Sequence, residues 1–145
     1  QNLFFDEVHF WEIKPKWAVE FLRIVLDFNA AGCNIYWAGL QFDFRREPFR
    51  LTGELMNRSH RLMHLIPPCR QCGQLGVFPQ RLIFGQPAWV GHPRFVPDTD
   101  EYHNMGITYE ARCRCCHVLT SKPNEHLRAI FRSLKRSNGT TRRRR

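Results

Sequence analysis

Several features that would place this 145-residue chain in a common class are missing. No apolar run approaches the roughly 18 residues of a membrane-spanning helix. Asp6 and Glu7 interrupt the first ten residues, which argues against a secretory signal peptide. Only four lysines are present, and none completes the G-x-x-x-x-G-K-S/T loop that cradles nucleotide phosphates. We therefore expect no membrane segment. If the chain handles nucleotides, we expect its phosphate cradle upstream of Gln1.

Acidic residues are almost absent from one end of the chain, although the net charge of +9 suggests a basic protein throughout. Residues 1–121 carry 13 basic and 12 acidic side chains, whereas residues 122–145 carry nine basic side chains and Glu125 alone. The body is therefore nearly neutral, and a nucleic-acid-binding face should be basic in the folded region. We expect a disordered, solvated tail ending in Arg142–Arg145, and nucleic acid as a partner only through that tail.

Cysteines are present in a pattern that indicates a metal site. Four of the six form two pairs with a two-residue gap, Cys69 with Cys72 and Cys113 with Cys116. A tetrahedral zinc ion takes thiolate ligands at this spacing, and Cys115 is the alternative ligand to its neighbours. Forty residues separate the pairs, against about 15 to 20 in a compact zinc ribbon. We expect a structural zinc ion at the base of a long binding loop, and a reducing, cytoplasmic location.

The first third of the chain has the pattern of a βαβ unit. The predicted order is strand, helix and strand, over Asn2–Phe5, Lys16–Ala31 and Asn34–Leu40. Gly32 is placed to end the helix. A crossover of this kind makes the strands parallel. The acids after the first strand and the loop after the second would then share the carboxyl edge of the sheet, where ligands bind in such folds.

Weaker patterns follow. We expect a helix over Thr52–Arg61, a strand over Leu62–Ile66 and a final helix over Asn124–Lys135. Prolines and glycines exclude a helix between the cysteine pairs and indicate an extended, turning loop; they are Pro79, Gly85, Pro87, Gly91, Pro93, Pro97 and Gly106. The predicted domains are a partial α/β core over 1–66, a zinc-binding region over 67–121 and the tail over 122–145.

Two features of the predicted carboxyl edge have chemical meaning. A buried strand that ends in Asp6 and Glu7 is the Walker-B arrangement, in which the aspartate helps to hold Mg²⁺ and a neighbouring carboxylate can deprotonate a nucleophile. The loop 41–50 places aromatic side chains among charged ones. We expect Phe44 and Phe49 to be exposed and to contact a planar ligand; the alternative is that they anchor the loop.

Four short segments, taken together in their order and spacing, match the motifs of one known family more closely than chance would allow. They are FFDEVHF at Phe4–Phe10, GLQFDFRREPF at Gly39–Phe49, CRQC at Cys69–Cys72 and YEARCRCCH at Tyr109–His117. From Leu3 to about Leu119 the chain resembles the zinc-containing (type II) thymidine kinases. The resemblance implies a P-loop NTPase (RecA-like) parallel-sheet core fragment, with a small zinc-ribbon lobe that carries a lasso loop.

The resemblance also implies roles for individual residues. The reaction would be ATP-dependent phosphoryl transfer to the 5′-hydroxyl of thymidine, with Glu7 as the general base and Asp6 supporting the Mg²⁺ that accompanies ATP. The residues that would wall the nucleoside are Phe10, Leu40, Phe44, Phe49 and Tyr109. The lasso would close over the thymine, held by structural Zn²⁺. The partners would be thymidine and ATP, and the assembly a homo-tetramer.

This sequence departs from the family pattern at two positions. His9 stands where glutamine is common, and Pro79 stands where threonine is usual, with Gln80 as a candidate to compensate. Two other interpretations stay open. Asp6 to His9 spells the box of a DExH helicase, although no Ser-Ala-Thr-like segment follows. A non-enzymatic zinc-ribbon module that binds nucleic acid through the tail is the other.

Overall fold

The computed structural model describes residues 1–96 and 106–141, with side chains described up to residue 133. The chain divides into two compact units, Gln1–Ile66 and Pro67–Arg145. Pro97 and the run 142–145 lie outside the described residues. Among the helices that are described, none combines the length and the apolar character needed to cross a membrane.

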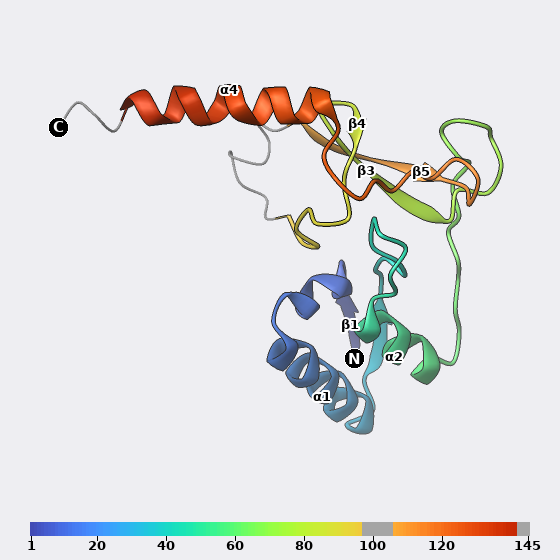
Figure 1. Ribbon diagram of the computed structural model, residues 1–145. Coiled ribbons are helices and arrows are strands. Elements are labelled where there is room, and N and C mark those ends of the chain that lie inside the picture. The colour runs from blue at the N-terminus through green and yellow to red at the C-terminus, as the bar shows by residue number, and fades with distance from the viewer. Residues whose placement is uncertain (97–105, 142–145) are drawn as a thin grey trace. The chain divides into compact units, whose positions relative to one another are not determined.

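Unit 1 (Gln1–Ile66) is built on a βαβ arrangement. Strands β1 (Asn2–Phe5) and β2 (Asn34–Trp37) pair in parallel, with Asn2 opposite Asn34 and Phe5 opposite Trp37. A short 3₁₀ helix, η1 (Val8–Ile13), and helix α1 (Pro15–Ala30) connect them (Figure 1). The predicted parallel pairing is confirmed, and Gly32 follows the helix with a φ of 83°, as its predicted role requires. Strand β2 is three residues shorter than expected, and η1 was not predicted.

The core of unit 1 lies between the strands and the helices. Helix α2 (Arg50–Arg58) begins and ends earlier than predicted and packs against η1 and α1. The cluster at the centre consists of apolar side chains from all three helices: Val8, Phe21, Val25, Leu51 and Leu55. The predicted strand over 62–66 is wrong, since these residues are exposed and have no strand partner among the described residues. An apolar run predicts a buried strand only where a neighbouring strand can pair with it.

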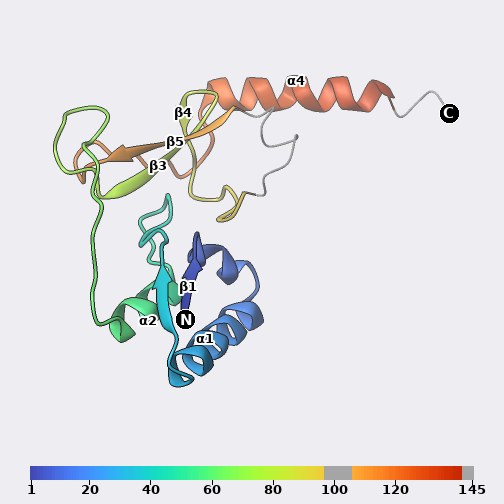
Figure 2. The same ribbon diagram turned by 180° about the vertical axis from the view of Figure 1, so that it is seen from behind.

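Unit 2 (Pro67–Arg145) contains an antiparallel sheet with the strand order β4-β3-β5. The strands are β3 (Phe78–Ile83), β4 (Gln86–Pro87) and β5 (Ile107–Arg112). Phe84 and Gly85 both have positive φ, as a two-residue hairpin between β3 and β4 requires. The region between the cysteine pairs is thus not only the expected loop. Its described residues contain no helix, as predicted, but they form a sheet (Figure 2).

Helix α4 (Glu125–Thr141) follows the second cysteine pair. Asn124 Oδ1 accepts the Leu127 amide at 2.9 Å, which caps the first turn. Leu127 is fully buried, and the Phe131 ring lies 5.9 Å from the Trp89 ring. The helix is six residues longer at its C-terminal end than predicted. Residues 125–141 are therefore helical rather than a disordered tail, and their first turns pack within unit 2.

Candidate functional site

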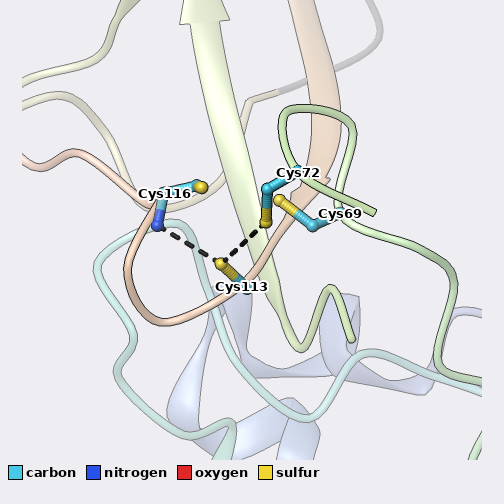
Figure 3. Close-up of side chains that lie close together, drawn as sticks. All are labelled: Cys69, Cys72, Cys113 and Cys116. Atoms are coloured by element: carbon cyan, nitrogen blue, oxygen red, sulfur yellow. Dashed lines mark hydrogen bonds between the residues drawn. The ribbon is translucent and has the colours of Figure 1, made fainter. Parts of the chain in front are cut away.

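The four paired cysteines converge on one point of unit 2. Their sulfur atoms all lie within 4.8 Å of one another, and the Cys72 and Cys113 sulfurs are 3.6 Å apart. Figure 3 shows Cys69 and Cys72 arriving from one loop and Cys113 and Cys116 from another. A tetrahedron of sulfurs with Zn–S bonds of about 2.3 Å has edges of about 3.8 Å. The donor set and its spacing therefore fit one zinc ion with four protein ligands.

Both cysteine loops are tight turns held by backbone hydrogen bonds. In the first loop the Gly73 amide donates to the Cys69 carbonyl at 2.9 Å. In the second, the His117 amide donates to the Cys113 carbonyl at 3.0 Å, and the Cys116 amide points at the Cys113 sulfur at 3.4 Å. Amides directed at sulfur stabilise the thiolate that a metal requires. Cys115 is exposed and is not one of the four converging cysteines.

The same contacts divide the four thiols into two kinds. Hydrogen bonds from backbone amides, that of Cys116 first, lower the pKa of Cys113. At Cys69, burial works against ionisation, but amides of Cys113, Gln71 and Cys72 still bring the pKa down to about 6. Hydrogen bonds with the thiols of Cys72 and Cys113 raise the pKa of Cys116 to about 12. Backbone amides thus favour the thiolate form of Cys69 and Cys113, which is the form that binds a metal ion.

The acidic pair lies at the carboxyl end of β1, in unit 1. Glu7 has a φ of 51°, a left-handed conformation that is uncommon for a residue with a side chain and that turns the chain from β1 into η1. The Glu7 amide donates to Asp6 Oδ1 at 2.8 Å. Partial burial, and then the neighbouring Asp6 charge, raise the pKa of Glu7. A carboxylate with a raised pKa is a stronger base than an ordinary one.

A close approach of the two strand ends brings the predicted loop next to this acid. A methyl group on Gly39 would meet Val8 Cγ2 at 2.7 Å, so only glycine fits there. The Val8 amide donates to the Ala38 carbonyl at 3.0 Å. The carboxyl ends of β1 and β2 therefore lie at one edge, as the βαβ pattern predicts.

His9 is at the centre of the predicted site residues in unit 1. Its Nδ1 accepts the Leu40 amide at 3.2 Å, so Nε2 carries the proton, and Nε2 lies 3.3 Å from Glu7 Oε2. The imidazole ring lies 4.6 Å from the Phe10 ring and 4.7 Å from the Phe49 ring. The predicted general base Glu7 and three of the residues expected to wall the nucleoside thus contact a buried histidine that was noted only as a departure from the family.

Hydrogen bonds within the loop 41–49 hold its conformation. Asp43 is buried, and its Oδ1 accepts the amides of Arg45 and Glu47 at 2.8 and 3.0 Å. Phe44 and Phe49 are buried as well, so the expectation that they are exposed is wrong. Their burial favours the alternative, in which these rings anchor the loop, and their contact with a planar ligand stays a prediction. Phe10 and Leu40 are more than two-fifths exposed.

The remaining predicted residue, Tyr109, lies in β5 of unit 2 and is half exposed. Its hydroxyl accepts a hydrogen bond from Arg81 Nε at 2.8 Å. Gln80, the candidate to compensate for Pro79, has a side chain that is bound within unit 2. Its amide group is buried and exchanges two hydrogen bonds with the Val118 backbone, at 3.0 and 2.7 Å. These bonds fasten β3 to the segment that follows the second cysteine pair.

A family model for thymidine kinase matches residues 1–117. The chain belongs to the thymidine kinase family. It is also similar to a thymidine kinase from Deinococcus deserti, with 36% identity over 115 residues. That region is 79% of this chain and 51% of the relative. The chain therefore spans about half the length of the curated relative that it matches, and α4 lies beyond the part that the family model covers.

Family membership places all four cysteines and both acids inside the matched region, and it confirms the resemblance drawn from the four segments. Sequence reasoning missed two residues of the site, His9 and Arg81. Each had a signal in the sequence. His9 lies two residues from the acid that it contacts, and Arg81 is the one charged residue of the strand FPQRLI, where a buried charge needs a specific partner.

Proposed function

We propose that this chain supplies the nucleoside site and the general base of a thymidine kinase, which transfers the γ-phosphate of ATP to the 5′-hydroxyl of thymidine. The family match supports the reaction class. The observation that carries the proposal is the acidic pair at the carboxyl end of β1, bridged through His9 to the amide of Leu40. The parallel pair β1 and β2 would be part of a P-loop NTPase core. Neither a helicase nor a nucleic-acid-binding zinc ribbon is favoured by the family match.

In this proposal Glu7 takes the proton of the 5′-hydroxyl as the sugar oxygen bonds to the γ-phosphorus and ADP leaves. His9 donates to the second carboxylate oxygen of Glu7 and keeps the other oxygen available. Phe10 and Leu40, both partly exposed, form the wall of the pocket, with Phe44 and Phe49 supporting it from beneath. We also propose Tyr109 as a nucleoside contact, as the resemblance implies.

Asp6 would support Mg²⁺ in the complete enzyme. Its side chain is exposed, one oxygen is used by the Glu7 amide, and Mg²⁺ takes only one or two protein carboxylates besides water and phosphate oxygens. When bound with ATP, the metal neutralises charge on the transferring phosphate. The zinc ion is structural, because four cysteines leave no open position on it. We also propose a homo-oligomer in the cytoplasm, as the resemblance implies.

The test is thymidine phosphorylation by the full gene product that contains this chain, with Glu7→Gln against the wild type. Removing a general base lowers turnover by about 100- to 10,000-fold. The dissociation constant for thymidine should change little, because Glu7 acts on the hydroxyl proton and not on the base. Glu12→Gln is the control, since Glu12 accepts the Leu51 amide and stands outside the proposed chemistry. Turnover retained by Glu7→Gln would remove Glu7 from the mechanism.

A further inference from the structure

A buried arginine lies beside the proposed nucleoside contact in unit 2. Arg81 is at the middle of β3, directly opposite Tyr109 of β5 in the strand register, and it is only 3% exposed. Side chains directly opposite one another in an antiparallel pair lie on the same face of the sheet. Arginine is almost never buried to this extent unless its donors are bound, so its partners indicate why it is there.

The guanidinium group joins two parts of the chain that are distant in sequence. Arg81 Nη2 donates to the Arg94 carbonyl at 2.7 Å, and Nη1 donates to His92 Nδ1 at 2.9 Å and to the Pro93 carbonyl. Arg81 Nε donates to the Tyr109 hydroxyl at 2.8 Å. A guanidinium group can only donate hydrogen bonds, so each of these partner atoms accepts one. The Nδ1 atom of His92 is therefore unprotonated.

The ring of Tyr109 is fixed but not covered. The centre of the guanidinium lies 5.3 Å from the ring centroid, within the range of a cation–π contact. Tyr109 nevertheless stays 52% exposed. Because its oxygen accepts from Arg81, its own O–H bond is directed elsewhere and remains a donor. The ring thus has a set orientation together with free surface for a ligand.

We propose that Arg81 is a positioning residue for nucleoside binding, which locks residues 92–94 and the ring of Tyr109 into one rigid surface before thymidine arrives. We call Arg81 and these four partners the Arg81 clamp. The inference rests on the proposed function, because it takes Tyr109 as a nucleoside contact. Arg81 itself does not touch the nucleoside. A binding surface that is already ordered loses less conformational entropy when the ligand binds.

The geometry explains why the residue is an arginine. The planar fork of five donors reaches acceptors on two sides at once, whereas a lysine ammonium is a single point with a flexible stem. A lysine at this position could bind the carbonyls of 93 and 94 or the Tyr109 hydroxyl, but not both. Arg81→Lys therefore keeps the charge and removes the connection.

The test compares Arg81→Lys and Tyr109→Phe with the wild type, in the zinc-loaded full gene product. Arg128→Lys on α4 is the matched control, because Arg128 makes an exposed pair with Glu125 in the same unit. Calorimetry gives the dissociation constant for thymidine, and hydrogen exchange gives the protection of the His92 and Arg94 amides. We expect Arg81→Lys to weaken thymidine binding about tenfold, as for loss of one hydrogen bond to a charged group. Exchange at His92 and Arg94 should quicken, and the control should match the wild type.

Tyr109→Phe keeps the ring and removes only the acceptor oxygen, so it serves if Arg81→Lys lowers the stability of unit 2. It should also weaken binding, and the double variant should bind no more weakly than Arg81→Lys alone, because both changes break one connection. A purely structural Arg81 would lower the melting temperature and leave the dissociation constant of the folded protein unchanged, which would overturn the proposal. Additive effects of the two changes would overturn it as well.

These results also separate the clamp from the proposed function. If the wild type does not bind thymidine, the proposed function fails and the role of the clamp in nucleoside binding fails with it. If the wild type binds thymidine and Arg81→Lys binds it equally well, only the clamp fails.

Discussion

Different kinds of interaction stabilise the interiors of the two units of this chain. Unit 1 has a continuous apolar cluster contributed by three helices, together with the partly buried face of its two strands. Within the described part of unit 2, few apolar side chains are buried. Unit 2 instead has the four-cysteine cluster, which is partly exposed at Cys72, and buried polar groups such as Gln80, Arg81 and His92. Stability in unit 1 therefore comes mainly from apolar burial, and in unit 2 from directed bonds.

The difference matches the proposed work of each unit. A general base must keep its position while its charge changes, and the packed core of unit 1 provides a rigid support for Glu7. A segment that closes on a ligand must instead be long, and few apolar groups can be buried along it. If one metal ion fixed both ends of the 40 residues between the cysteine pairs, it would reduce the conformational freedom of this segment without the need for an apolar core.

Removal of the metal is expected to have the largest effect. Structural zinc contributes about 10–16 kcal/mol in zinc-finger peptides, as much as the whole stability of a typical domain. Chelation, or Cys69→Ser, should therefore unfold unit 2 and leave the amide spectrum of unit 1 unchanged, as two-dimensional NMR would show. Cys33→Ser in unit 1 and Cys115→Ser in unit 2 are the controls, and both should still bind one zinc ion per chain. Native unit 2 signals without metal would contradict this division.

Truncating a side chain in the apolar cluster should destabilise unit 1 and leave unit 2 unchanged, the opposite of metal removal. Leu55 is buried in the apolar cluster that also contains Val8 and Phe21, and a leucine-to-alanine change in a core costs about 2–5 kcal/mol. Denaturation followed by hydrogen exchange should show the loss in unit 1, while the zinc content of unit 2 stays the same. Met63→Ala, at an exposed position, should have almost no effect. Equal loss in both units would mean that the units do not unfold separately.

A smaller effect tests the close approach of the strand ends in unit 1. Gly39→Ala would place a methyl group 2.7 Å from Val8 Cγ2, and overpacking of this kind costs about 1–3 kcal/mol. The added methyl on Gly53, within α2, meets nothing within 4 Å. Gly53→Ala should therefore stabilise the helix by up to about 1 kcal/mol. Melting curves of the two variants should move in opposite directions, and a shift in the same direction would be evidence against the contact.

The smallest expected change concerns the acid of unit 1. Because the folded protein raises the pKa of Glu7, its protonated form is favoured on folding. The resulting stabilisation is present at pH below the pKa of the unfolded chain and is lost as the pH rises through the folded value. Asp6→Asn should lower the pKa of Glu7 only part of the way, since burial is the larger cause. A carbon-13 titration of the Glu7 carboxyl would measure this, and an upward shift would contradict it.

Much of the candidate site could be predicted from local patterns. The apolar run, the acids after it and the helical period of α1 indicated a βαβ unit with carboxylates at one edge. The two-residue gaps predicted the metal ligands, because a tight turn brings two sulfurs together within a few residues. The same reasoning failed for residues 62–66 and for the exposure of Phe44 and Phe49, where burial depends on neighbours elsewhere in the chain.

The sequence by itself determined the composition of each unit, the four cysteines that could hold a metal ion, and the order of acid, loop and cysteine pairs that marks the family. Only the tertiary structure decided the partners of His9 and Arg81. Those contacts join residues 31 positions apart at Leu40 and 28 positions apart at Tyr109. No periodicity or spacing encodes them, because each depends on how separate strands meet. The structure thereby showed how a buried histidine and a buried arginine hold the groups to which the sequence assigns the chemistry.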